Sequence, residues 1–213
     1  MFKKKAFFIV FEGIEGSGKS YHCKKTIKFL HKKRIKTKSI REPGGCKTAE
    51  KIRNLILTGK TNKFDKLTDT LLYLAARNEN FIKNIKNNLL KKQVIVCDRF
   101  IDSTIAYQAY GLNVNRIFIE RVNNYILNNF KPDLVIYLYA NKQVIRKRLN
   151  KRINKNRYDK FSFKFYQKVH HGYLSISKKR KNFIKVNTSD SAFSVQKKIL
   201  GIIEKKIKLW KKK

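Results

Sequence analysis

Cysteine is scarce in this 213-residue chain, and its spacing excludes two classes of small-domain scaffold. Cys23, Cys46 and Cys97 are an odd number, lie far apart and form no Cys-x-x-Cys pair. This pattern excludes a disulfide framework and a zinc site, and it is typical of a protein of the reducing cytoplasm. No apolar run approaches the length that a membrane-spanning helix needs. We therefore expect a cytoplasmic protein that does not act on or in a membrane.

Acidic residues are also few: there are 14, against 52 basic residues, and the formal net charge is +38. Such an excess is compatible with a nucleic-acid-binding protein. However, 40 of the basic residues are lysines, and they are spread along the whole chain. We interpret the excess as drift towards the lysine and asparagine of an A/T-rich coding sequence. Non-specific nucleic-acid binding through a lysine-rich surface is then at most a side effect.

Apolar runs alternate with segments of helical periodicity, which predicts an α/β fold. Because the expected strands are apolar throughout, the pattern indicates a parallel sheet with helices on both faces. Strands are expected at 7–11, 36–40, 93–97, 134–138 and 183–186, and helices at 19–31, 49–56, 68–90, 102–109, 115–129, 141–152, 161–178 and 191–210. No repeat or long linker divides the chain, so residues 1–213 are expected to form one domain. The stretch 146–160 is too charged to be core and is predicted to be a mobile surface segment.

The most informative motif follows the first expected strand. It is Gly13-Ile14-Glu15-Gly16-Ser17-Gly18-Lys19-Ser20, with the spacing G-x-x-x-x-G-K-[ST] of a phosphate-binding loop. Glycines let successive backbone N–H groups point inward at phosphate oxygens. Lys19 is expected to reach the β- and γ-phosphates of ATP, and Ser20 to be a ligand of Mg²⁺.

Three further segments narrow the choice among P-loop enzymes. They are Arg41-Glu42-Pro43-Gly44-Gly45, Leu72-Tyr73-Leu74-Ala75-Ala76-Arg77, and Asp98-Arg99-Phe100 followed by Ser103-Thr104 and Ala106-Tyr107-Gln108. In this order and spacing the chain resembles the thymidylate kinases, nucleoside monophosphate kinases that convert dTMP to dTDP for dTTP synthesis. The resemblance covers nearly the whole chain. It implies the P-loop nucleoside monophosphate kinase fold with a five-stranded parallel sheet, Mg²⁺-ATP as phosphoryl donor, and a homodimer.

The resemblance also implies roles around dTMP. Arg41 and Arg99 match arginines that hold its phosphate, and guanidinium groups suit this because they bind phosphate oxygens bidentately. Tyr73 matches a residue that stacks on thymine. Arg77, one helical turn later, matches an arginine that donates to thymine O4 and so rejects the amino group of cytosine.

Other matched positions complete the expected substrate pocket. Pro43 corresponds to a wall near the base, and Thr104 to a side chain that reads the base edge. Ser103 of the same motif is also expected to bind dTMP. Tyr107 corresponds to a tyrosine at the place of a ribose 2′-hydroxyl, which favours deoxyribose. Glu15 corresponds to an acidic P-loop residue that binds the 3′-hydroxyl.

A P-loop without arginine goes, in this family, with a lid that supplies positive charge. Arg148, Arg152 and Arg157 lie in the expected lid, about 146–160, and we expect Arg157 to matter most. Together with Lys19 and Arg99 they would neutralise the transferring phosphoryl group. Asp98 ends its strand as a Walker B-type aspartate does, and is expected to hold Mg²⁺ through water or to orient the acceptor phosphate.

Some positions depart from the family pattern. Cys46 replaces the usual Thr or Ser, Phe100 the usual Tyr or His, and Tyr139 a frequent Asp, while Asn150 stands where a lid arginine can occur. Two other functions stay open. A deoxynucleoside kinase would phosphorylate thymidine itself, and a nucleic-acid-stimulated P-loop ATPase would place its basic residues in one groove.

Overall fold

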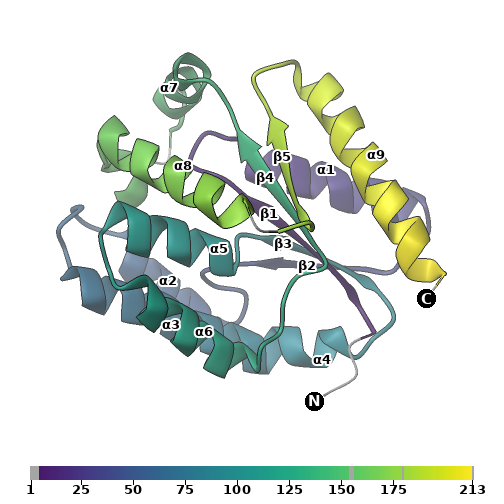
Figure 1. The fold of residues 1–213 in the computed structure, drawn as a ribbon, viewed down its shortest axis with the longest axis horizontal. Coiled ribbons are helices and arrows are strands. Elements are labelled where there is room, and N and C mark those ends of the chain that lie inside the picture. Colours follow the sequence, from purple (N-terminus) through teal and green to yellow (C-terminus); the bar gives the residue numbers. More distant parts are fainter. Residues whose placement is uncertain (1–4, 154–155, 179, 213) are drawn as a thin grey trace.

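The centre of the molecule is a five-stranded parallel sheet with the strand order β2-β3-β1-β4-β5 (Figure 1). The computed structural model describes residues 5–153, 156–178 and 180–212. The strands are β1 (Phe7–Glu12), β2 (Thr37–Arg41), β3 (Val94–Asp98), β4 (Leu134–Tyr139) and β5 (Phe183–Asn187). The predicted α/β class and five-stranded parallel sheet are confirmed.

Helices cover both faces of this sheet. They are α1 (Lys19–Lys32), α2 (Lys47–Leu57), α3 (Lys66–Asn80), α4 (Lys86–Leu89), α5 (Ile101–Thr104), α6 (Arg116–Leu127), α7 (Lys142–Asn150), α8 (Phe163–Ser177) and α9 (Ala192–Lys211). Side chains alternate along each strand, so β1 supplies both cores: Phe8 and Val10 join one apolar cluster, and Ile9 and Phe11 join the other. The second cluster is closed by α1 and α9, and the first by helices that include α6 and α8. Burial on both faces explains the unbroken apolar runs.

Two expected helices contain π-helical turns that their periodicity does not signal. Phe81–Ile85 (η1) interrupts the helix expected at 68–90, and Ile105–Gly111 (η2) continues α5. Such turns often occur at functional sites. Here η2 carries Tyr107 and Gln108, both of which line the cavity described below.

The expectation of a mobile, solvated surface at 146–160 is wrong for its last part. Residues 154–155 lie outside the described residues, but Arg157–Lys160 form a 3₁₀ turn, η3. Arg157 and Tyr158 are each only 2% exposed. Arg157 pairs with Asp69 of α3, and a charge paired in this way can be buried.

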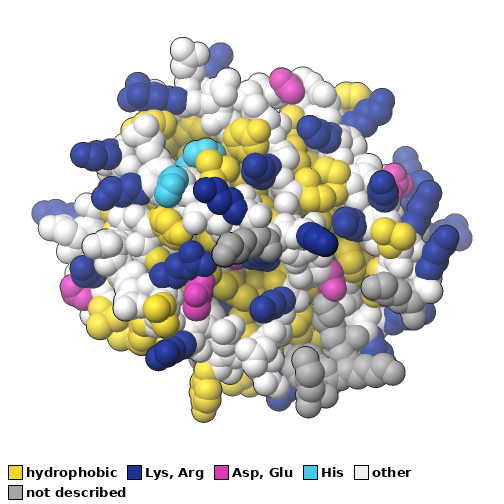
Figure 2. All heavy atoms as spheres, viewed as in Figure 1, with side chains coloured by type: hydrophobic (Ala, Val, Ile, Leu, Met, Phe, Trp, Pro, Cys, Tyr) yellow, Lys and Arg dark blue, Asp and Glu magenta, His cyan; other side chains and the backbone are white. Residues whose placement is uncertain are grey.

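The basic side chains are distributed over the surface. On the face seen in Figure 2, Lys and Arg are scattered among apolar and uncharged polar groups, with few acidic ones. Among the described residues, none of the helices combines the length and the apolar character that crossing a membrane requires.

The P-loop packs against the end of β4 so closely that Gly13 has no room for a side chain. Its φ is +146°, and an added Cβ would lie 2.3 Å from the carbonyl oxygen of Leu138. We expect Gly13→Ala to lower the free energy of unfolding by at least about 2 kcal/mol, because overpacking and backbone strain each cost roughly 1–3 kcal/mol. Urea denaturation measures this.

Gly201, in the middle of α9, provides the matched control. An added Cβ there meets no atom within 4 Å. Gly201→Ala should therefore raise the free energy of unfolding by about 0.5–1 kcal/mol, as expected for a helix interior. Equal effects of the two substitutions would contradict the close packing of the P-loop.

Candidate active site

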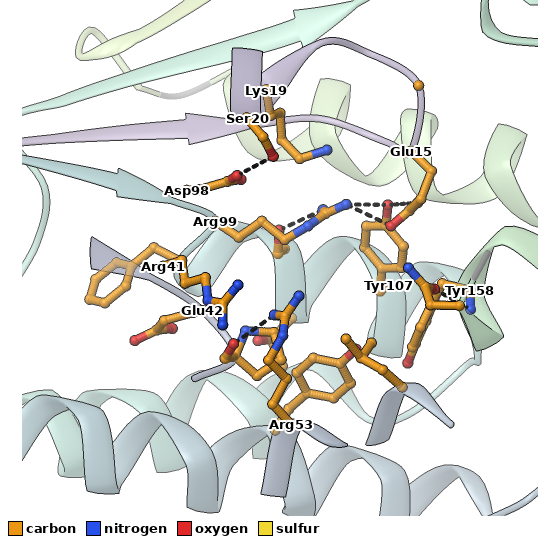
Figure 3. A pocket seen from close by; sticks show the side chains of 18 of the residues that line it. Glu15, Lys19, Ser20, Arg41, Glu42, Arg53, Asp98, Arg99, Tyr107 and Tyr158 are labelled. Atoms are coloured by element: carbon orange, nitrogen blue, oxygen red, sulfur yellow. Dashed lines mark hydrogen bonds and ion pairs between the residues drawn. The ribbon is translucent and has the colours of Figure 1, made fainter. Parts of the chain in front are cut away.

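A cavity of about 430 Å³ lies where the loops after β1, β2 and β3 meet (Figure 3). Because the strands are parallel, their carboxyl ends share one edge of the sheet, the usual place for ligands in such folds. The predicted site residues that line it are Glu15, Gly16, Gly18, Lys19, Ser20, Arg41, Pro43, Tyr73, Arg77, Asp98, Arg99, Ser103, Thr104, Tyr107 and Arg152. Gly13, Ile14, Ser17, Arg148 and Arg157 are not part of this lining.

The P-loop turns directly into α1. Gly18 is the N-cap with φ +88°, so α1 begins at Lys19. Lys19 is 7% exposed, and its Nζ donates to the carbonyl oxygen of Ile14 at 2.9 Å. Burial, followed by the positive charge of Arg99, lowers the pKa of Lys19 to about 8. Lys19 is therefore a buried cation that an anionic ligand would stabilise.

Two oxygen-bearing side chains meet beside this lysine. The Ser20 hydroxyl donates to Oδ2 of Asp98 at 2.7 Å, so the start of α1 touches the end of β3. Mg²⁺ prefers oxygen ligands and usually retains several waters and substrate phosphates. Ser20 and Asp98 could thus supply the protein's share of a magnesium site. Within the described ranges, no group of three His, Cys, Asp or Glu forms a larger metal cluster.

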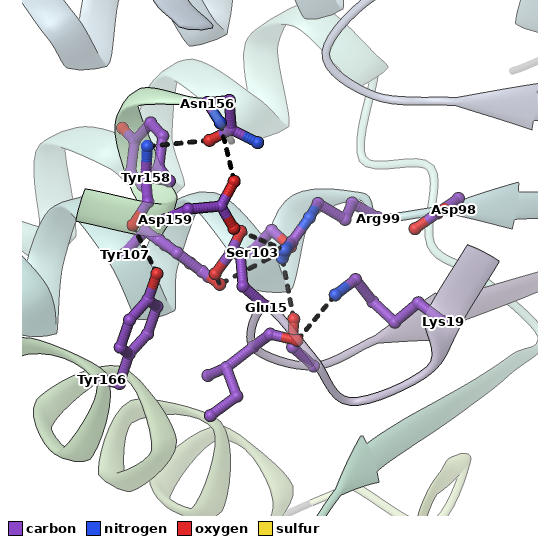
Figure 4. A network of polar contacts seen from close by, with 12 residues as sticks. Glu15, Lys19, Asp98, Arg99, Ser103, Tyr107, Asn156, Tyr158, Asp159 and Tyr166 are labelled. Atoms are coloured by element: carbon purple, nitrogen blue, oxygen red, sulfur yellow. Dashed lines mark hydrogen bonds and ion pairs between the residues drawn. The ribbon is translucent and has the colours of Figure 1, made fainter. Parts of the chain in front are cut away.

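Arg99 joins the P-loop to the loop after β3 (Figures 3 and 4). Its Nη2 pairs with Oε1 of Glu15 at 2.7 Å, and its Nη1 donates to the carbonyl oxygen of Gly13 at 2.8 Å. The Tyr107 hydroxyl donates to the other carboxylate oxygen of Glu15 at 2.5 Å. Burial alone would raise the pKa of Glu15, but Arg99 and then Lys19 lower it below its ordinary value. Glu15 is accordingly held as a carboxylate inside the cavity.

The loop after β2 forms a second wall. Arg41 ends β2, and its Nη2 pairs with Glu50 of α2 at 2.7 Å. Pro43 follows a cis peptide bond, and its carbonyl oxygen accepts from Nη1 of Arg53 at 2.7 Å. Arg53 itself lines the cavity. Arg53 is therefore a cavity arginine that the sequence motifs did not indicate.

The predicted base pocket is present as a set of neighbouring wall residues. Tyr73 and Arg77, one turn apart on α3, both line the cavity. Arg77 is 3% exposed and donates through Nε to Glu42 at 2.7 Å and through Nη1 to Asn123 at 2.6 Å. The hydrogen bonds among described residues include none from its Nη2, which is left for a ligand.

The Thr104 side chain has a hydrogen-bonding group that the described residues do not satisfy. Its Oγ1 is buried, yet it has no hydrogen-bond partner in the described part of the chain. Buried hydroxyls are normally paired. Ser17 Oγ and Arg157 Nε are also unpaired among the described residues, but of the three residues only Thr104 lines the cavity, which makes its hydroxyl a candidate ligand contact.

The three lid arginines occupy different places. Arg152 lines the cavity and pairs with Asp159 at 2.7 Å. Arg148 donates to the carbonyl oxygen of Thr188 at 2.7 Å and lies outside the cavity lining. Arg157 is turned into the core towards Asp69. Of the three lid arginines, only Arg152 lines the cavity in this structure, and the expected importance of Arg157 stays a prediction.

Arg53, Gln108 and Tyr158 are lining residues to which the sequence reading gave no role. Arg53 lies on an amphipathic helix, where a charged residue looks like part of a solvated face. Tyr158 stands in a stretch dominated by charge. Gln108 is the one with a usable signal, since it belongs to the Ala-Tyr-Gln motif after Thr104.

The departures from the family pattern are placed as follows. Cys46 is the N-cap of α2, outside the cavity lining. Phe100 is 1% exposed and lies 5.5 Å beneath the guanidinium of Arg77, as part of the wall. The Tyr139 ring stacks on Tyr137 with a centroid distance of 6.0 Å.

Comparison with known proteins agrees with this geometry. The family model for thymidylate kinase matches residues 11–199. The thymidylate kinase of Clostridium novyi is 34% identical over 94% of this chain and 99% of its own length, and that of Mycoplasma capricolum is 38% identical over 94% and 96%. A crystal structure of thymidylate kinase from Ehrlichia chaffeensis superimposes with a TM-score of 0.77 at 28% identity, covering 93% of this chain and 98% of that one. The chain belongs to the thymidylate kinase family.

Proposed function

We propose that this chain transfers the γ-phosphoryl group of ATP to the phosphate of dTMP in one in-line step, without a covalent intermediate. One observation carries the proposal: a single cavity contains a P-loop lysine and, on another wall, an aromatic and arginine pocket with an unpaired hydroxyl. In Figure 3, Arg99 lies between the Lys19–Asp98 end and the Arg53 end. The whole chain would act as one domain, with residues 146–160 as its lid.

In this proposal the catalytic contribution is positioning and charge. The P-loop backbone, Gly13 to Ser20, and Lys19 hold the donor phosphates. Arg41 and Arg99 hold the acceptor phosphate, and Arg152 adds positive charge from the lid. Asp98 orients the acceptor phosphate or contacts Mg²⁺ through water.

We propose Ser20 and Asp98 as the protein ligands of Mg²⁺. Their oxygens, 2.7 Å apart on the cavity wall, fit a hard cation that otherwise binds water and phosphate. When bound, Mg²⁺ would neutralise charge on the donor phosphates.

The acceptor pocket is proposed to read both base and sugar. Tyr73 and Pro43 pack against thymine, Arg77 donates to O4 and Thr104 contacts the base edge. The Glu15 carboxylate accepts from the 3′-hydroxyl. Ribose is disfavoured because Tyr107 occupies the place of a 2′-hydroxyl.

An ADP-release assay with Mg²⁺-ATP and different acceptors tests this function. We expect dTMP to be the best acceptor, with dUMP about 10- to 200-fold poorer in kcat/KM because it lacks one methyl group. With dCMP the rate should be close to background, since Arg77 cannot accept from an amino group.

Three results of this assay would contradict the proposal. Comparable rates with dCMP would remove the role of Arg77. Turnover of thymidine would indicate a deoxynucleoside kinase, and release of ADP only with single-stranded DNA would indicate a nucleic-acid-stimulated ATPase.

The lid arginines give a second test, because their surroundings predict opposite defects. Arg152→Ala should lower kcat by roughly 10³-fold, the size found for arginines that stabilise transferring phosphoryl groups. It should cost less stability than Arg157→Ala, because the Arg152 side chain is 42% exposed and its partner Asp159 keeps the hydrogen bond from the backbone N–H of Asn156. Arg157→Ala should instead destabilise the fold by about 3–5 kcal/mol, because it leaves buried Asp69 without its counter-charge. Steady-state kinetics and urea denaturation measure the two effects.

Lys151→Ala is the matched control, since Lys151 is an exposed cation next to Arg152 and outside the cavity lining. It should alter neither property. A kcat loss of less than tenfold in Arg152→Ala would show that another lid residue supplies the charge.

We also propose a homodimer. Exposed apolar side chains gather on the adjacent helices α3 and α6: Leu67 is 46% exposed, Leu71 47%, Ile117 59% and Tyr125 90%. Exposed apolar surface of this kind marks protein–protein contacts. Sedimentation equilibrium should give twice the chain mass of 25.2 kDa, and a single-chain mass at micromolar concentration would contradict the dimer.

We assign no specific nucleic-acid partner. The scattered lysines support only weak, salt-sensitive binding to polyanions. The three unpaired cysteines suit the reducing cytoplasm, where we place the enzyme.

A further inference from the structure

Glu12, the last residue of β1, is a buried carboxylate with no place in the cavity lining. It is 0% exposed. Its Oε1 accepts from the backbone N–H groups of Phe100 at 2.9 Å and Ser103 at 3.2 Å. Its Oε2 accepts from the Ser103 hydroxyl at 2.5 Å and the Tyr173 hydroxyl at 2.9 Å. These four bonds use the full acceptor capacity of one carboxylate.

Both backbone donors belong to the turn that follows Arg99 and consists of α5 and its N-cap Phe100. Arg99 has φ +68°, which is unusual for a residue with a side chain. Such a conformation persists only where its surroundings hold it in place. Oε1 of Glu12 supplies such support, because it accepts from the backbone N–H groups of Phe100 and Ser103, which follow Arg99 in the sequence.

The Oε2 atom acts on the Arg99 side chain through Ser103. A serine hydroxyl has one hydrogen to donate, and here it goes to Glu12. The oxygen of Ser103 is then free to accept from Nη1 of Arg99, at 3.2 Å. The same Nη1 donates to the carbonyl oxygen of Gly13, the residue that follows Glu12.

We propose that Glu12 is a positioning residue: through the turn and through Ser103, it orients the Arg99 guanidinium for the acceptor phosphate. This rests on the proposed function in one respect, that Arg99 binds the phosphate of dTMP. Glu12 itself touches no substrate.

The hydrogen bonds to Glu12 also offset the cost of burying its charge. Burial, and then the negative charge of Asp102, raise the pKa of Glu12 to about 7. An ionised carboxylate is costly at such a site unless it is paired. The Ser103 and Phe100 hydrogen bonds lower the pKa against these effects, and the bond from the Ser103 hydroxyl requires an acceptor at the position of Oε2.

Glu12→Gln separates the two functions of the carboxylate. The amide oxygen can keep the bonds to Phe100 N and Ser103 N, whereas the amide nitrogen cannot accept from the Ser103 hydroxyl. Calorimetric titration with dTMP and with thymidine then isolates the phosphate. We expect dTMP binding to weaken roughly 10- to 100-fold, the range for hydrogen bonds to charged groups, and thymidine binding to change less than threefold.

Two variants accompany this measurement. Ser103→Ala removes the connecting hydroxyl and should give the same selective loss, and combining it with Glu12→Gln should add little. Because it leaves the carboxylate in place, Ser103→Ala also decides the question if Glu12→Gln does not fold. Tyr173→Phe removes only the other donor to Oε2 and should weaken dTMP less than threefold.

Arg99→Ala tests phosphate binding by Arg99 separately from the positioning of Arg99 by Glu12. If its dTMP affinity relative to thymidine equals that of the wild type, Arg99 is not the phosphate ligand and the proposed role of Arg99 fails. If Arg99→Ala loses the preference for dTMP but Glu12→Gln and Ser103→Ala keep it, only the positioning role is overturned. Equal losses for dTMP and thymidine in Glu12→Gln, or a loss in Tyr173→Phe as large as in Glu12→Gln, overturn it as well.

Discussion

The ion pair between Arg99 and Glu15 is the contact on which the site depends, because it ties the loop after β1 to the loop after β3. A buried guanidinium must be compensated for the loss of water. The carbonyl oxygen of Gly13 and the hydroxyl of Ser103 complete this compensation on the other side of Arg99. The sheet brings the two loops to the same edge, but these polar contacts fix how they face one another. The position of the proposed acceptor site relative to the P-loop would therefore follow from charge compensation.

The few acidic residues of the chain are concentrated where such compensation is needed. Glu12, Glu42, Asp69 and Asp102 are each at most 4% exposed, and the last three pair with arginines. The uncompensated positive charge is thus largely a property of the surface, where lysines are solvated and screened. This division explains how a chain with a net charge of +38 forms a compact interior, and why the charge says little about the reaction.

The features that could be predicted from the sequence are those that depend on residues close together along the chain. Continuous apolar runs such as Val94–Cys97 predict buried parallel strands, and the P-loop spacing predicts the turn at Gly18 and the start of α1. The burial of Arg157 could not be predicted, because it depends on Asp69, 88 residues earlier. The role of Glu12 was hidden for the same reason: as the polar end of an apolar strand it looks ordinary, and its partners on β3–α5 and α8 come together only in the fold.

The arrangement of cations also explains how binding and chemistry would be coupled. Arg99 lies close enough to Lys19 for its positive charge to help lower the pKa of Lys19, whereas the pKa of Arg99 itself, despite its burial, is raised by Tyr107 and Glu15. Repulsion between the two cations therefore destabilises chiefly the charged form of Lys19. In the free protein Glu15 offsets part of this repulsion. Donor and acceptor phosphates would offset more of the repulsion between Lys19 and Arg99. The repulsion would be reduced most when negative charge lies between these two cations. Charge spreads there during the proposed phosphoryl transfer, so the repulsion between Lys19 and Arg99 would favour the transition state over either substrate alone.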